Sequence, residues 1–67
     1  MFQLDTVKLR GLLFKKKISA RKLAENANLT AKTVLKLLHN GKANFKTIGK
    51  LADALNCNGE ELILKEM

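Results

Sequence analysis

The chain has 67 residues, a formal net charge of +7, one cysteine, one histidine and no proline, tryptophan or tyrosine. This length suffices for one small domain over residues 1–67. The cysteine and histidine counts exclude an internal disulfide and a tetrahedral zinc site, so we expect neither a metal nor another cofactor. Leucine, alanine and lysine dominate, which favours helices. No apolar run is long enough for a membrane span and no secretion signal is visible, so we expect a cytoplasmic protein.

The charge is unevenly distributed along the chain. Residues 1–50 hold 12 of the 13 basic residues and two acidic residues, a balance of +10, whereas residues 51–67 hold one lysine and four acidic residues, a balance of −3. Such a basic body indicates a polyanionic partner, nucleic acid ahead of a membrane surface, with the acidic end turned away from it. The alternative is that both signs of charge only keep the protein in solution.

The first predicted helix begins after Asp5, which is its N-cap, and ends at about Lys16. Leu4 before the cap and Leu9 after it form a hydrophobic staple. The apolar surface of this helix comes from Val7, Leu9, Leu12, Leu13 and Phe14.

The second and third predicted helices are short and close together. Ser19 caps the second helix, and its apolar stripe follows helical spacing through Ala20, Leu23, Ala24 and Ala27. Asn28 ends this helix, because asparagine tolerates a left-handed backbone. Thr30 caps the third helix, which runs to about His39 before the pair Asn40 and Gly41 terminates it.

Two further helices complete the prediction. Asn44, in a short loop over residues 42–46, caps a fourth helix with the apolar stripe Ile48, Leu51, Ala52 and Leu55. Asn58 and Glu61 form a capping box for a short fifth helix with the sequence GEELIL. We interpret Phe45 and Cys57 as residues of the core or its edge. The predicted fold class is therefore all-α, with five helices.

The second and third helices have the spacing of a helix-turn-helix, because only Asn28, Leu29 and Thr30 separate them. We count the helix-turn-helix as a twenty-residue unit that begins at Ala20. Its fifth position is the small residue Ala24, where the third helix crosses closely, and its ninth position is Asn28, which tolerates a left-handed backbone. The positions that hold the two helices against the domain are apolar: Leu23, Ala27, Leu29, Val34 and Leu37. Similar patterns also occur in helical bundles that bind no DNA.

In these features the chain resembles the Cro/CI-type (XRE) helix-turn-helix family of phage repressors and bacterial regulators. The segment ISARKLAENANLTAKTVLKLL is similar to the core unit of that family, and NFKTIGKLADALNCNGEEL is similar to its fourth and fifth helices. The resemblance extends from about residue 7 to residue 64 and implies a compact lambda-repressor-like DNA-binding domain.

Two features depart from the family pattern. Ala20 stands where the family often has a glutamine that contacts a phosphate and braces the recognition helix. Leu13 and Leu38 stand where the family often has a salt bridge, so we expect an apolar contact between the first and third helices instead. Neither departure affects the predicted fold.

The third helix divides into an apolar side and a polar side at about 100° per residue. In related repressors the start of this helix enters the major groove, which implies that its exposed residues read bases. The candidates for base reading are Ala31, Lys32, Thr33 and Lys36. Lysine donates to guanine O6 and N7, and an alanine methyl group meets the methyl group of thymine. For the lysines the alternative is a solvated helix face.

The neighbours of these candidates have other expected roles. Leu35, at the edge of the apolar arc, is expected to pack on the fourth helix rather than on DNA. His39 lies too far toward the helix C-terminus to reach bases. Phosphate contacts are expected at the starts of the second and fourth helices, where free N–H groups attract anions. The candidates are Ser19, Arg21, Lys42, Asn44, Lys46 and Thr47. For each lysine, ordinary solubility is the alternative.

We therefore expect a non-enzymatic, sequence-specific regulator of double-stranded DNA. A symmetric homodimer would bind a palindromic operator with its recognition helices about 34 Å apart, through an interface that includes Leu62 and Ile63. Because repression needs only binding, a repressor is favoured over an activator. One alternative is an antitoxin-type module that uses the same fold to bind a protein. General RNA or single-strand binding is another, against which the few aromatic residues argue.

Overall fold

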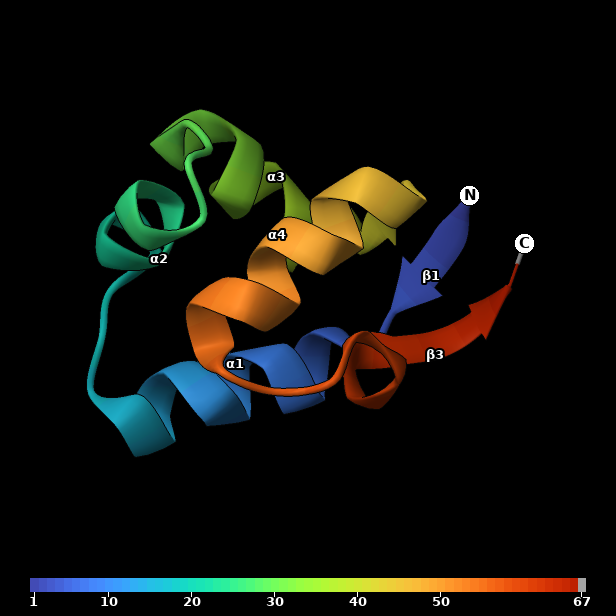
Figure 1. The fold of residues 1–67 in the computed structure, drawn as a ribbon, viewed down its shortest axis with the longest axis horizontal. Helices are drawn as coiled ribbons and strands as arrows, with labels where there is room; N and C mark the ends of the chain where they lie inside the picture. The colour runs from blue at the N-terminus through green and yellow to red at the C-terminus, as the bar shows by residue number, and fades with distance from the viewer. Residues whose placement is uncertain (67) are drawn as a thin grey trace.

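The structure is a computed structural model and describes residues 1–66. It contains four α-helices, one short 3-10 helix and a small sheet (Figure 1). The elements follow one another as β1 (Phe2–Leu4), α1 (Thr6–Lys16), α2 (Ala20–Asn26), α3 (Ala31–Asn40), β2 (Lys42–Ala43), α4 (Phe45–Leu55), η1 (Gly59–Leu62) and β3 (Ile63–Glu66). The prediction is confirmed for the first four helices and wrong at both ends of the chain, where strands form.

The sheet joins the two ends of the chain (Figure 1). β1 is its central strand and pairs antiparallel with both β2 and β3, so that Phe2 lies opposite Ala43 and Leu4 opposite Ile63. The predicted fifth helix is wrong, because only Gly59–Leu62 form a helical turn before the chain enters β3. Six residues are too few for a stable isolated helix, and β1 supplies backbone partners for this segment.

Local capping sets the helix boundaries as the sequence predicts. The side chains of Asp5, Ser19, Thr30 and Asn44 each accept a hydrogen bond from a backbone N–H three residues later, at 2.8 to 3.1 Å. Asn28 has a left-handed backbone with φ of 58°. The predicted pairing of Asn58 with Glu61 is also present, because the Glu61 carboxylate accepts from the Asn58 N–H at 3.2 Å.

The core lies between the four α-helices and the sheet. Its fully buried large side chains are Leu4, Leu9, Leu23, Val34, Leu51, Leu55 and Leu62. Leu13 belongs to this core and the half-buried Leu38 packs against it, while the direct contact between these two side chains stays a prediction. No helix within residues 1–66 is long and apolar enough to cross a bilayer.

Two predictions about packing are wrong. Phe45 is 80% exposed, because it is the first residue of α4 and points outward before the buried stripe of that helix begins. Leu35 is 58% exposed. The reason is that α3 packs mainly against α2 and α1 rather than against α4. Cys57 is half-buried at the edge of the core, as expected.

Candidate nucleic-acid interface

The turn between α2 and α3 holds these two helices in a fixed relation. The Leu29 N–H donates to the Ala24 carbonyl at 2.8 Å, and the left-handed Asn28 lets the chain reverse between the helices. Leu23 on α2 and Val34 on α3 are both fully buried. The packed side of α3 is therefore committed to the domain, and its other side is free for a ligand.

The free side of α3 is basic, and α3 contains no carboxylate. Lys32, Lys36 and His39 are exposed, as is Thr33, whose hydroxyl lies 2.8 Å from the Thr30 hydroxyl. That hydrogen bond orients the Thr33 side chain and leaves the two lysines as the freer donors.

Ala31 is half-buried at the start of α3. Part of its methyl group therefore packs against the protein, and the rest remains open to a ligand. Of the four predicted base-reading residues, Ala31 offers the least surface.

A hollow of about 460 Å³ brings predicted base-reading and phosphate-contacting residues together. Its polar lining comes from Thr33, Lys36 and Asn40 on α3 and from Lys42, Asn44 and Thr47 in the following segment and α4, and its apolar lining comes from Met1, Leu37 and Ala43. The predicted residues Ser19, Arg21 and Lys46 are outside this hollow. They are exposed near the starts of α2 and α4.

Asn40 is a residue of this hollow that the sequence indicated only as a helix terminator. Its side-chain oxygen accepts from the Lys42 N–H at 2.9 Å, which orders the connection from α3 to β2. The backbone that carries Lys42 into the hollow therefore depends on Asn40. In the sequence, the pair Asn40 and Gly41 indicated a turn at the end of the third helix. It did not indicate that Asn40 would line a hollow.

The C-terminal end of α3 is held by residues that the sequence did not identify. The Gln3 amide donates to the Asn40 carbonyl at 3.0 Å, and the Arg10 guanidinium donates to the Leu38 carbonyl at 2.8 Å. Carbonyls in the last turn of a helix have no partner within the helix, so these bonds satisfy groups that are otherwise free. Together they fix the direction in which α3 presents its lysines.

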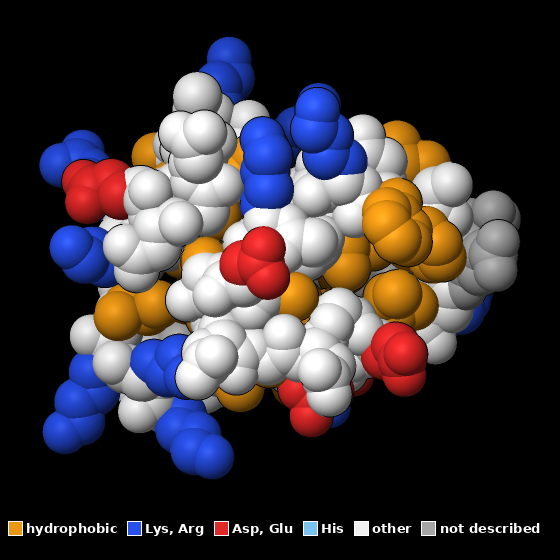
Figure 2. Space-filling view, in the orientation of Figure 1, with side chains coloured by type: hydrophobic (Ala, Val, Ile, Leu, Met, Phe, Trp, Pro, Cys, Tyr) orange, Lys and Arg blue, Asp and Glu red, His pale blue; other side chains and the backbone are white. Residues whose placement is uncertain are grey.

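Basic side chains are spread over much of the surface (Figure 2). Lysine and arginine side chains project from the top, the left and the lower left of this view, and hydrophobic side chains gather mainly on the right, with a smaller group on the left. Lys22 pairs with Glu25 at 3.9 Å, but this exposed pair adds little stability.

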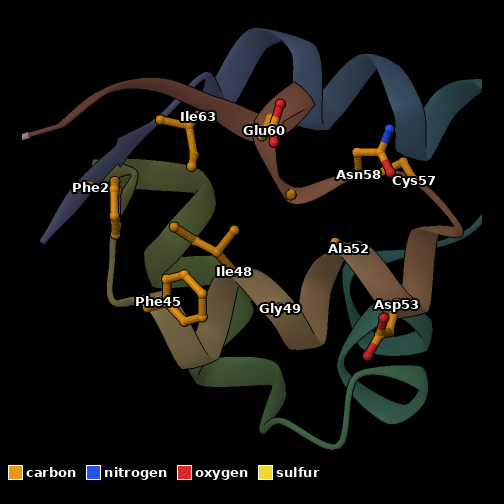
Figure 3. Close-up of a pocket in the computed structure, with 11 residues that line it drawn as sticks. Phe2, Phe45, Ile48, Gly49, Ala52, Asp53, Cys57, Asn58, Glu60 and Ile63 are labelled. Atoms are coloured by element: carbon orange, nitrogen blue, oxygen red, sulfur yellow. The ribbon is translucent and has the colours of Figure 1, made fainter.

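An apolar hollow of about 570 Å³ lies beside α4, between this helix and the ends of the chain (Figure 3). Phe2, Phe45, Ile48 and Ile63 gather at one end of it. We call this surface the α4 hollow. Leu62, a predicted interface residue, is 0% exposed and belongs to the core, so only its neighbour Ile63 can contribute to an interface here.

Cys57 lies at the other end of the α4 hollow (Figure 3). Burial, and then the negative charge of Glu61, raise the pKa of the Cys57 thiol. The thiolate is the nucleophilic form of cysteine, so a raised pKa makes this side chain less reactive at neutral pH. Within residues 1–66 no group of potential ligand side chains is placed to hold a metal ion.

A tight turn between α2 and α3, a packed recognition helix and a basic free face define a helix-turn-helix DNA-binding protein. A family model described as the Cro/C1-type HTH DNA-binding domain matches residues 8–64. The chain belongs to this family. Searches of curated proteins and of solved structures gave no match.

Proposed function

We propose that the protein is a repressor that binds a palindromic operator as a homodimer. The observation that carries this proposal is the carboxylate-free side of α3, which continues into the hollow lined by Lys42, Asn44 and Thr47. A convex basic helix beside a concavity that carries Lys36, Lys42 and Asn44 suits a major groove with a phosphate backbone at its edge.

In this proposal the side chains of α3 read bases and the surrounding residues set the position of the domain. Lys32 and Lys36 donate to guanine O6 and N7, while Thr33 and the exposed part of Ala31 contact neighbouring base edges. Phosphates bind at the starts of α2 and α4, where helix N–H groups point outward. The residues in this second role are Ser19, Arg21, Lys42, Asn44, Lys46 and Thr47.

Selection of bound sequences from random duplexes tests sequence specificity. The wild-type protein should enrich a palindrome, and Lys32→Ala and Lys36→Ala should each relax the preference at particular base pairs, by about 1–3 kcal/mol. Lys46→Ala should weaken binding to all duplexes alike. If the selection enriched no particular sequence, the proposal that the protein recognises a specific operator would be contradicted. Equal behaviour of all three variants would contradict the assignment of reading residues.

We place the dimer interface at the α4 hollow. Phe45 is exposed there at the same end of the hollow as Ile63, and burial of such an apolar surface drives stable association. Sedimentation should show a dimer that Phe45→Asp converts to a monomer, while Leu64→Asp, at an exposed leucine outside the hollow lining, leaves it dimeric. A dimer that survives Phe45→Asp would contradict this interface.

Repression follows from binding alone when the operator overlaps a promoter. A reporter gene with the selected palindrome over its promoter should be silenced by the wild-type protein and released by the double variant Lys32→Ala, Lys36→Ala. Increased expression with the wild-type protein would contradict repression and indicate an activator.

A further inference from the structure

Helix α1 carries two large apolar side chains that neither the core nor the DNA-facing surface uses. Val7 is 79% exposed and Phe14 is 82% exposed. They are seven residues apart, so they lie on nearly the same line along the helix, about 10 Å from each other. Between them lies Gly11, where an added Cβ would meet no atom within 4 Å. We call Val7, Gly11 and Phe14 the α1 stripe.

The α1 stripe is bordered by positive charge on both sides. Helical geometry places the exposed Lys8 and Lys15 along one side of it and the exposed Arg10, whose guanidinium also donates to the Leu38 carbonyl, along the other. The helix Thr6–Lys16 contains no aspartate or glutamate. Its buried residues, Leu9 and Leu13, are on the opposite side, so the stripe faces directly away from the core.

We propose that the α1 stripe binds an acidic amphipathic helix of another protein. Two apolar anchors at i and i+7 match the side-chain spacing by which one helix packs on another, and the exposed glycine lets the two backbones approach closely. Carboxylates on both edges of the partner helix would face the cations on both edges of the stripe.

Two other occupants fit these observations less well. DNA gains little from Val7 and Phe14, because apolar side chains do not bind phosphates. A second copy of this chain, docked through the same face, would bring its own Lys8, Arg10 and Lys15 against identical charges.

The position of α1 leaves DNA binding free. In Figure 1, α1 runs along the lower edge of the molecule and α2 and α3 lie toward the upper edge, and α1 packs on α3 with its inner side. A helix bound on the outer side of α1 and a duplex bound at α3 therefore occupy different surfaces. The stripe provides a means to bring an acidic protein to the DNA site, and its binding does not depend on the proposed operator.

A selection of displayed random peptides, 16 residues long, against the full chain tests this inference. Enriched peptides should carry apolar residues at helical spacing with acidic residues on both flanks. A synthetic copy of the most enriched peptide should lose affinity for Phe14→Ala by about tenfold or more, as is typical when a central anchor is removed. Its dissociation constant should also rise with salt concentration.

Leu64→Ala is the matched control, since Leu64 is a large apolar side chain at 61% exposure that lies outside both the α1 stripe and the lining of the α4 hollow. It should leave peptide affinity unchanged. Enrichment of neutral or basic peptides, or affinity that depends on Leu64 instead of Phe14, would overturn the inference. So would self-association, or binding to phosphatidylserine vesicles, that disappears in Phe14→Ala. DNA binding by Phe14→Ala should equal that of the wild type, which separates this test from that of the proposed function.

Discussion

Leu35 shows that the neighbouring helix, rather than the residue's place in an apolar arc, decides whether a side chain is buried. In sequence, Leu35 belongs to the same broad apolar side of α3 as Leu37. In the structure α3 packs against α2 and α1, which cover Leu37 at 5% exposure and leave Leu35 at 58%. Helical periodicity predicted the centre of the buried side correctly, but its edge depends on which helix lies across it.

The two leucines should therefore differ in their contribution to stability. Leu37→Ala removes buried methyl groups and leaves a cavity, so it should lower the free energy of unfolding by about 2–5 kcal/mol. Leu35→Ala should change it by less than about 0.5 kcal/mol, because the side chain is mostly in water. Urea denaturation of both variants measures the difference. Equal losses would mean that Leu35 is buried by a contact that the monomer lacks.

Within residues 1–66, three residues other than glycine adopt a left-handed backbone: Lys17, Asn28 and Asn56, with φ of 57°, 58° and 54°. Asparagine was recognisable in this role at position 28 because its short polar side chain tolerates the conformation. Lysine gives no such signal, so the left-handed end of α1 was not foreseen. Lysines such as Lys15, Lys16 and Lys17 are common at the C-terminus of any helix, where cations interact favourably with the helix dipole.

Lys17→Gly should accordingly stabilise the protein by roughly 1 kcal/mol, since glycine adopts this conformation without steric cost. Asn28→Gly should give a smaller gain, because asparagine is already tolerated there. Thermal unfolding of the two variants, with the wild type alongside, tests this order. A lower melting temperature for Lys17→Gly would show that the lysine side chain stabilises the end of α1 in some other way.

At the scale of elements, helices were predictable and strands were not. Each helix start depends on a side chain and a backbone N–H three residues apart, and such pairs can be read directly from sequence. β1 has three residues and β2 has two, too few for an alternating pattern to appear. Their existence depends on pairing between residues near opposite ends of the chain, such as Leu4 and Ile63.

For the candidate site too, local features could be predicted from the sequence and contacts between distant residues could not. Lys32 and Lys36 follow from helical angles within α3, and both are exposed as expected. Gln3 and Arg10 could not be predicted, because they bond to carbonyls of α3 that are 37 and 28 residues away. The sequence alone identified the exposed lysines of α3. The residues that hold the C-terminal end of α3 in place, Gln3 and Arg10, could be identified only in the structure.

The junction between α3 and β2 should be highly sensitive to substitution. Gly41 has φ of 73°, and an added Cβ would lie 3.1 Å from the Leu4 carbonyl oxygen and against the Gln3 side chain. Gly41→Ala should therefore destabilise the protein by about 1–3 kcal/mol and weaken DNA binding, because α3 loses its anchor.

Gly49→Ala is the control for this prediction, since Gly49 lies within α4 with no atom within 4 Å of its added Cβ. It should raise stability by about 0.5–1 kcal/mol, the usual gain of alanine over glycine inside a helix. Urea denaturation and duplex binding measure both variants. If Gly41→Ala proved as stable as Gly49→Ala, the connection to β2 would have to adopt another backbone conformation.

At the scale of the whole molecule, the sheet and the charge distribution act together. Because β1 pairs with β3, Glu66 lies opposite Phe2 in the sheet, and Asp53 and Glu60 line the α4 hollow. Of the carboxylate side chains that the structure describes in residues 51–65, none lines the hollow beside α3, where Lys36 and Lys42 lie. This separation allows a chain with a net charge of +7 to attract DNA mainly through one surface.

Salt dependence distinguishes docking by named lysines from diffuse attraction by net charge. The logarithm of the binding constant should fall linearly with the logarithm of salt concentration, and Lys42→Ala and Lys46→Ala should each reduce the slope by about one, because each removes one phosphate contact of the proposed complex. Lys65→Ala removes the same charge from the exposed face of β3 and should leave the slope unchanged. Anisotropy titrations of a labelled operator over a range of salt concentrations supply these slopes. Equal slope changes for all three variants would mean that DNA responds to the total charge of the chain rather than to a docked surface around α3 and the start of α4.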